Sequence, residues 1–169
     1  MISATREERH WLLRNLAQGL FQHLAVAVPP VPVEELHKHP PQVFEIDFGV
    51  VDMFKCLWDA TFARPPSGQG SVFVRFDLSP EERRAALARE TLHALVSSRH
   101  GRSMGLGEML GDSLRESAEY FAGHLTAPEV LVTAYRKRSG DHPDGFANSF
   151  GIPAPVASAR WAESAELIQ

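Results

Sequence analysis

The stretch from Phe76 to His100 constrains the fold more than any other part of the chain. Ser79 precedes Pro80, and Glu82 stands three residues after Ser79, which is the pattern of a helix whose start is capped by two reciprocal side chains. Residues suited to packing then recur at helical spacing in two rows, Leu87, Thr91, Ala94 and Ala88, Leu92, Leu95. The sequence therefore predicts a central helix over about residues 80–98.

Length and composition set the scale of the molecule. The chain has 169 residues, of which 44% are hydrophobic, and this suits one domain over residues 1–169 with its own core. The formal net charge of −4 lacks the basic excess that nucleic-acid-binding domains carry. Cys56 is the single cysteine, which excludes an internal disulfide framework and a cysteine-based zinc knuckle.

A second capped helix begins near the N-terminus. Thr5 and Glu8 form a capping-box pattern, and the helix should end near residue 24 because leucines recur every four residues, at Leu12, Leu16, Leu20 and Leu24. The prolines of segment 29–32 require an extended chain, and residues 33–36 suit one short helical turn. His37 and His39 then lie between prolines, where we expect solvated loop histidines.

Three segments before the central helix have strand character. Residues 43–48 alternate apolar and acidic side chains, which predicts a half-buried strand. Residues 53–62 suit one or two strands, and residues 71–76 form a short β-prone run after a proline- and glycine-rich loop at 65–70. Short strands followed by helices indicate an α+β fold in which a small β-sheet packs against several helices.

The C-terminal half is predicted to be helical. Four glycines between residues 101 and 111 indicate a mobile connection, and a helix over about 111–127 carries one narrow apolar stripe. Residues 136–141 are charged and suit a loop in which the three basic side chains are solvated. A helix pair over about 145–167 completes the same domain.

The central helix also carries a chemical motif. Glu90 and His93 match the glutamate and second histidine of the pattern His-Glu-x-x-His, in which both histidines bind one zinc ion and the glutamate activates its water. Arg89 stands in place of the first histidine, and a guanidinium has no lone pair to donate to a metal. We expect Glu90 to pair with Arg89 or Arg115, and His93 to be an ordinary hydrogen-bonded histidine.

The setting of this motif resembles the ImmA/IrrE family of phage- and stress-associated zinc endopeptidases, which cleave helix-turn-helix repressors. The resemblance covers nearly the whole chain, although only the two central helices carry specific motifs. It rests on the pattern Arg-x-x-x-Ala-x-Glu-x-x-His-Ala-Leu and on further segments at Pro30–Leu36, Phe121–Leu125 with Pro128, Phe146–Ile152, and Val156 with Arg160. The resemblance implies a zincin-like fold with a degenerate His-Glu-x-x-His motif.

The same resemblance implies where a third zinc ligand should stand. The family places a glutamate four to six residues before the Phe-Ala pair, and in this chain Arg115 and Ser117 occupy the ends of that window. Glu116 and Glu119 are nearby, but helical geometry puts them opposite the apolar stripe and in water. Of the expected ligands only His93 remains, with Glu90 at the general-base position.

We therefore expect a protein that has lost zinc-peptidase activity, has no resident cofactor, and acts as a protein-binding regulatory module. The partner suggested by the resemblance is a helix-turn-helix repressor. The alternative is an active zinc endopeptidase with an unorthodox ligand set, in which His93 would be joined by Glu116 or Glu119 and by His100 or His124.

A second alternative is a DNA-binding protein that uses the C-terminal helix pair. Residues 147–152 followed by Val156 resemble the turn of a helix-turn-helix, but Pro153 and Pro155 crowd the next helix, whose one basic residue is Arg160. The first residues lack the apolar segment of a signal peptide, and no apolar run reaches the length of a membrane span. A cytoplasmic location without a membrane partner is the resulting expectation.

Overall fold

Both long helices begin at the capping boxes that the sequence predicts. In the computed structural model, which describes residues 4–66 and 68–166, the Thr5 hydroxyl accepts a hydrogen bond from the Glu8 N–H at 3.2 Å, and Ser79 and Glu82 form the same arrangement. The helices are α1 (Arg6–Leu24), α2 (Val33–Lys38), α3 (Pro80–Ser97), α4 (Arg99–Ser103), α5 (Leu106–Leu110), α6 (Leu114–Thr126), α7 (Glu129–Ser139), α8 (Phe146–Phe150) and α9 (Ala154–Glu166), with 3-10 turns η1 (Gln42–Phe44) and η2 (Gly111–Ser113).

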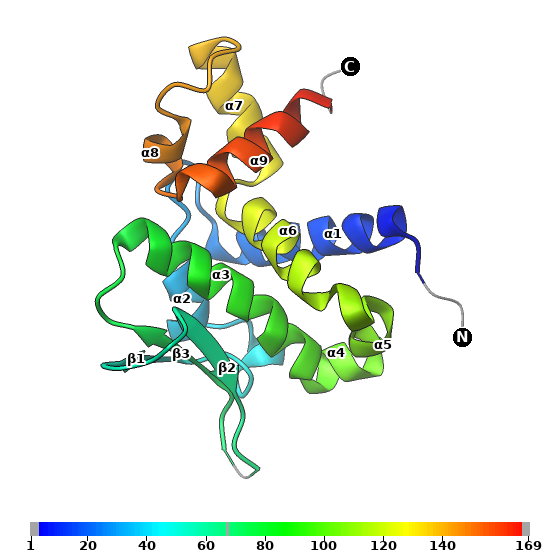
Figure 1. Ribbon diagram of the computed structural model, residues 1–169. Coiled ribbons are helices and arrows are strands. Elements are labelled where there is room, and N and C mark those ends of the chain that lie inside the picture. Colours follow the sequence, from blue (N-terminus) through cyan, green and yellow to red (C-terminus); the bar gives the residue numbers. More distant parts are fainter. Residues whose placement is uncertain (1–3, 67, 167–169) are drawn as a thin grey trace.

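Three short strands form one sheet. These are β1 (Val50–Met53), β2 (Ala60–Ala63) and β3 (Ser71–Arg75), in the order β1-β3-β2. Central β3 runs parallel to β1, with Val72 opposite Val50, and antiparallel to β2, with Val74 opposite Ala60. Val72 and Val74 are fully buried because α3 covers that face of the sheet. The prediction of a small sheet packed against helices, an α+β fold, is confirmed at this level (Figure 1).

The strand predicted over residues 43–48 is wrong. Its first residues form η1, and the Phe48 N–H donates to the Phe44 carbonyl at 3.0 Å, which is a helical turn. Phe44 and Phe48 therefore share one face and stack with ring centroids 5.0 Å apart. Two aromatic residues four positions apart pack well on one side of a helical turn. The alternation of apolar and acidic side chains that predicted a strand therefore reflects an i, i+4 pair of a helical turn.

Two other segments that were predicted as irregular connections are largely helical. The glycine-rich segment after α3 folds into α4, α5 and η2 instead of an irregular connection. It does so because the Ser98 hydroxyl caps the next helix by accepting from the Gly101 N–H at 2.9 Å. Likewise α7 continues through Arg136, whose guanidinium lies 3.7 Å from the Trp161 ring instead of in solvent.

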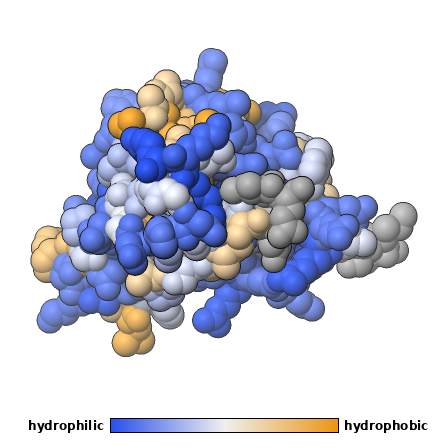
Figure 2. Space-filling view, turned by 90° about the horizontal axis from the view of Figure 1, so that it is seen from above, coloured by the Kyte–Doolittle hydropathy of each residue, from blue (hydrophilic) through white to orange (hydrophobic). Residues whose placement is uncertain are grey.

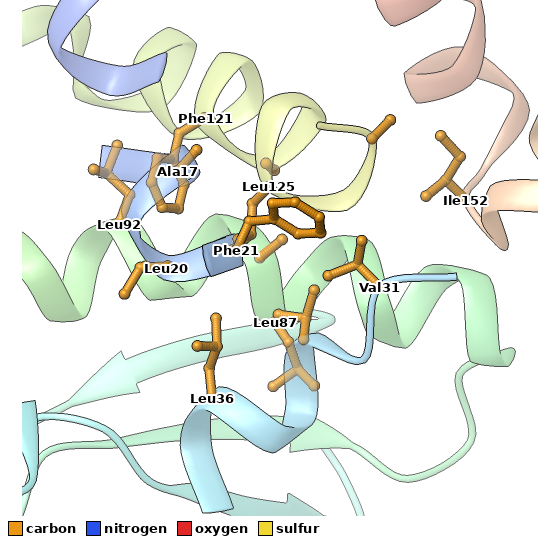
Figure 3. Packing of buried hydrophobic residues seen from close by; sticks show 14 of the residues in the cluster. Ala17, Leu20, Phe21, Val31, Leu36, Leu87, Leu92, Phe121, Leu125 and Ile152 are labelled. Carbon is orange, nitrogen blue, oxygen red and sulfur yellow. The ribbon is translucent and has the colours of Figure 1, made fainter. Parts of the chain in front are cut away.

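The hydrophobic core lies where α6 packs against both α1 and α3 (Figure 3). Leu20 and Phe21 come from α1, Leu87 and Leu92 from α3, and Phe121 and Leu125 from α6, with further contributions from Val31, Leu36 and Ile152. The C-terminal half of α6 is buried on every side, so the stripe is wider than predicted. The face of the molecule seen in Figure 2 is mainly hydrophilic, with small separate apolar patches.

The C-terminal helices α8 and α9 share the same core as the rest of the chain. Phe146 and Phe150 of α8 are buried, and both ring systems contact Tyr135 of α7 edge-on. Figure 1 places α7, α8 and α9 on the side of α3 opposite the sheet. The middle of α3, with Arg89, Glu90 and His93, contacts the sheet and α6.

Candidate functional site

The motif helix lines an open groove of about 840 Å³. The groove is bounded by α3, by the N-terminal half of α6, and by the chain that enters β2; its lining residues are Leu57, Trp58, Asp59, Ala60, Arg89, Glu90, His93, Leu114, Arg115, Ala118 and Glu119. The structure thus brings Arg89, Glu90, His93 and Arg115 together at one site. Ser117 lies elsewhere, because its side chain is buried against the core.

The Glu90 carboxylate is already engaged from two sides. Its Oε2 accepts a hydrogen bond from the Phe62 backbone N–H at 2.8 Å and lies 2.8 Å from Nδ1 of His93. Both contacts fall on Oε2, and the side chain, which retains 13% exposure, also lines the groove. The expected pairing of Glu90 with Arg89 or Arg115 is wrong, because a strand backbone and a histidine on the next turn occupy the carboxylate instead.

Arg89 reaches across the groove to α6. Its Nε lies 3.6 Å from Oε1 of Glu119, whose side chain is 55% exposed. Glu116 is also mostly exposed and pairs with Arg6 at 3.1 Å. Both acidic residues are therefore on the solvent side of α6, as helical geometry predicts. Glu119 is nevertheless close enough to the groove to form an ion pair with Arg89.

The histidines of the alternative ligand set do not meet. His100 is exposed and lies edge-on to Phe44, whereas His124 is buried and its Nε2 lies 2.9 Å from Glu163 of α9. His93 contacts Glu90 alone among these acidic and histidine side chains. In residues 4–66 and 68–166, no three His, Cys, Asp or Glu side chains are placed so that they could share a metal ion.

The residues present do not fit a catalytic zinc site. Such a site needs three protein ligands with free lone pairs and one open position. Arg89 offers no lone pair, and Arg115 on the α6 side of the groove is a cation as well, so Nε2 of His93 has no second and third ligand beside it among the residues that the structure describes.

Strand β2 presents a free edge to this site within the described part of the chain. The Arg75 N–H donates to the Asp59 carbonyl at 2.9 Å, and this register turns the N–H and C=O groups of Ala60 and Phe62 away from β3. The Phe62 N–H accordingly reaches Glu90. Ala60 lines the groove with its backbone groups on the same side.

Two exposed apolar side chains border the same edge, and sequence reasoning did not single them out. Leu57 is 93% exposed and Trp58 is 64% exposed, although both belong to the apolar run that was predicted as strand. Residues 54–59 between β1 and β2 belong to neither strand, so Leu57 and Trp58 lie outside the sheet. The sequence signal that could have indicated their exposure is the length of the apolar run at residues 53–62, which exceeds one short strand.

His37 also differs from expectation. It lies in α2, is 4% exposed, and its Nε2 is 2.9 Å from the Thr91 hydroxyl of α3. Burial lowers its pKa from 6.5 to about 4. The spacing of Val33, Leu36 and His37 at i, i+3 and i+4 was the signal that could have placed this residue on the buried face of a helix.

The C-terminal helices are not built as the DNA-binding alternative assumed. Arg160 is 2% exposed, its Nε donates to the Ala127 carbonyl at 2.9 Å, and its Nη1 lies 3.5 Å from Glu163. The one basic side chain that this alternative assigned to a duplex therefore lies inside the fold. Phe146 and Phe150 of the preceding helix are buried as well.

Comparison with known proteins yields a fold relationship alone. No family model matches the chain, and no curated protein matches it significantly. A solved structure described as a Mycobacterium tuberculosis transcriptional regulator superposes with a TM-score of 0.64 at 20% sequence identity, over 89% of this chain. The matched region is 46% of that protein, so this chain spans less than half of its length.

None of the helices within residues 4–66 and 68–166 has the length and apolar character needed to cross a bilayer.

Proposed function

We propose that this chain is a zincin-like module of the ImmA/IrrE kind whose former active-site groove binds a protein partner without cleaving it. The partner class is a regulator with a helix-turn-helix domain, and no resident metal takes part. The cytoplasm is the compartment in which such a partner would be met.

The observation that carries this proposal is the engagement of Glu90. A general base must be free to hold and deprotonate a water molecule. Here the Phe62 N–H and the His93 ring both contact Oε2 of Glu90, each at 2.8 Å, so one carboxylate oxygen is committed to structural contacts, and Arg89 replaces a metal ligand with a fixed positive charge. These contacts support a structural use of residues that would perform catalysis in a zinc peptidase.

The groove retains features of a peptide-binding surface. Extended peptides can join the free edge of a sheet through backbone hydrogen bonds, while pockets beside the edge select side chains. Ala60 supplies the backbone groups, and exposed Leu57 and Trp58 supply apolar contact area next to them. Tryptophan is among the residue types that contribute most to binding energy at interfaces.

The nature of the partner rests on the family resemblance of the sequence. Members of that family act on helix-turn-helix repressors, and the solved neighbour of similar fold is described as a transcriptional regulator. A chain that kept the groove and lost the chemistry would retain binding to such a regulator. This makes it a regulatory module in place of an enzyme.

The decisive experiment measures binding to a purified helix-turn-helix repressor, by titration calorimetry with the protein described by this sequence. Ala60→Pro removes the groove-facing N–H without removing a bond to β3, and we expect it to weaken binding by about tenfold or more. Ala60→Val keeps the N–H and serves as the matched control. Equal affinity of the two variants would count against edge pairing as the binding mode.

A second measurement addresses catalysis directly. We expect the regulator to remain intact after prolonged incubation with the protein in the presence of added zinc. Cleavage of the regulator that disappears in a Glu90→Gln variant would contradict the proposed loss of peptidase activity and would favour the alternative of an active zinc endopeptidase.

A further inference from the structure

A separate cavity of about 310 Å³ lies between α1, α6 and α9. Its size is at the lower end of the range for small-molecule sites. The cavity shares one lining residue, Glu119, with the groove and is otherwise built from different residues. A ligand of this cavity is therefore independent of the function proposed for the groove.

Arg160 of α9 lines this cavity and carries a buried donor without an acceptor. The residue is 2% exposed, its Nε donates to the Ala127 carbonyl at 2.9 Å, and its Nη1 lies 3.5 Å from Oε2 of Glu163. These contacts fix the guanidinium, but its Nη2 has no hydrogen-bond partner within residues 4–66 and 68–166. A buried N–H that lacks an acceptor is destabilising, so this nitrogen requires an oxygen atom from a bound molecule.

The carboxylates around the cavity do not meet this need, because each of them is already paired with a cation. The pairs are Glu116 with Arg6 at 3.1 Å, Glu119 with Arg89 at 3.6 Å, and Glu163 with Arg160 at 3.5 Å. The positive charge of Arg160 is therefore balanced, and its Nη2 lacks a hydrogen-bond acceptor and not a negative charge. An uncharged oxygen fits this arrangement better than an anion, which would also lie close to the Glu163 carboxylate.

The walls of the cavity favour an aliphatic ligand over an aromatic one. Both faces of the Tyr120 ring are covered, one by His10 with ring centroids 3.7 Å apart and the other by His124 with centroids 4.6 Å apart. No face of this ring is therefore open for stacking. Helix α9 supplies apolar surface instead, from Pro155, Val156 and Ala159.

Gly123 enlarges the cavity from the α6 side. Glycine in the interior of a helix destabilises the helix relative to alanine. Apart from the backbone of its own helix, a Cβ atom at this position would have one neighbour, Cδ of Arg160 at 3.9 Å, which is an ordinary contact distance. Packing within the protein therefore does not require glycine here, and its effect is to leave space beside the Arg160 side chain.

We infer that this cavity binds a small uncharged carbonyl compound with a compact aliphatic body. The carbonyl oxygen accepts a hydrogen bond from the Nη2–H of Arg160, and the aliphatic body lies against Val156 and Ala159 in the space beside Gly123. Because Arg160 is held at Nε and Nη1, the donor is fixed in place before the ligand binds. This preorganisation favours a ligand with an acceptor over one that only fills the cavity with apolar surface.

Three compounds with the same ring separate an uncharged acceptor from a charged group. Cyclohexanecarboxamide is the probe, cyclohexanecarboxylate is the matched anion, and cyclohexylmethylamine is the matched cation, which has no acceptor. In an NMR titration of the protein we expect saturable binding of the carboxamide, with shifts of the Gly123 amide and of the Arg160 side-chain N–H resonances. The carboxylate should bind more weakly by about tenfold or more, and the amine should show no saturable binding.

Two substitutions test the position of the ligand. Gly123→Ala should raise the melting temperature because alanine favours the helix, and it should weaken carboxamide binding by about threefold or more because the new methyl group occupies the cavity. Ala159→Phe, at an exposed position of α9, fills the cavity and should weaken binding by about tenfold or more. Ala165→Phe is the matched control, since residue 165 is exposed on the same helix and does not line the cavity, and it should leave the affinity unchanged.

Absence of saturable carboxamide binding would mean that water alone satisfies Nη2 of Arg160 and would overturn the site. Equal or tighter binding of the carboxylate or the amine would contradict an uncharged acceptor as the ligand. Equal effects of the two phenylalanine substitutions, or unchanged affinity in a Gly123→Ala variant that is more stable, would place the ligand elsewhere. Circular dichroism verifies that each variant is folded.

Discussion

Glu90 on the motif helix and Phe62 on the edge strand are joined by a hydrogen bond of 2.8 Å from the strand N–H to the carboxylate. This contact fixes the free edge of β2 against α3, and it gives the residue at the general-base position a structural task. The same carboxylate holds His93, so strand, helix and motif form one connected unit.

Removing the Glu90 carboxylate should therefore reduce stability. Glu90→Ala leaves the Phe62 N–H without a partner in a half-buried position, and we expect a loss of about 1–3 kcal/mol in the free energy of unfolding. Glu90→Gln keeps an acceptor oxygen and should lose clearly less. Urea denaturation of both variants measures the difference; if Glu90→Ala is as stable as the native protein, the bond has no structural role.

Rebuilding the zinc site should require position 115 and not position 117. Arg115 lines the groove, whereas the Ser117 side chain is buried against the core. Arg89→His combined with Arg115→Glu should give measurable zinc binding by titration calorimetry, because residue 89 lies one helical turn before His93 on α3 and residue 115 lines the groove from α6. Arg89→His with Ser117→Glu is the matched control and should bind no zinc; zinc binding by this control would show that the groove is bounded differently.

Gly101 should be intolerant of any side chain. A Cβ atom there would lie 1.9 Å from the Leu95 carbonyl oxygen, in the turn where α3 passes into α4. Gly101→Ala forces that backbone apart, and we expect a loss of about 3 kcal/mol or more. At Gly107 the nearest atom is a Val96 methyl group at 3.8 Å, so Gly107→Ala should be neutral or slightly stabilising. Thermal unfolding of the Gly101→Ala and Gly107→Ala variants measures this difference in stability. Similar melting temperatures for the two variants would contradict the prediction.

The buried His37 should make stability depend on pH in a defined window. Its folded pKa of about 4 is below the unfolded value of 6.5, so the unfolded state binds more protons between these two values. Stability is present in full above pH 6.5 and is lost as the pH falls toward 4, by up to about 3 kcal/mol from this residue. His10 and His124, whose pKa values are also lowered by burial, act in the same direction.

A substitution isolates the part that belongs to His37. His37→Gln keeps a polar partner for Thr91 and has no titrating group, so its stability should fall less between pH 6.5 and 4. The loss that Glu163 causes lies lower, between about 4.5 and 2, because its folded pKa is about 2. Denaturant unfolding across both windows separates the contributions, and parallel curves for native protein and variant would contradict the assignment to His37.

Patterns local in the sequence determined the helices with strong starts. The capping boxes at Thr5 and Ser79 fix where α1 and α3 begin, and the rows around Leu87 and Leu92 fix which face of α3 is buried, because caps and helical periodicity act over a few residues. The same local information gave strand β3 and excluded Arg89 as a metal ligand, since a guanidinium has no lone pair in any fold.

Only the tertiary structure decided which residues meet. The partner of Glu90 is a backbone N–H of residue 62, the partner of Arg89 is Glu119, and His37 is buried against Thr91. None of these pairs has a signal in sequence spacing, because each depends on how α3 packs against β2, α6 and α2. For the same physical reason residues 43–48 form a turn: packing of Phe44 on Phe48 outweighs a weak local preference for strand.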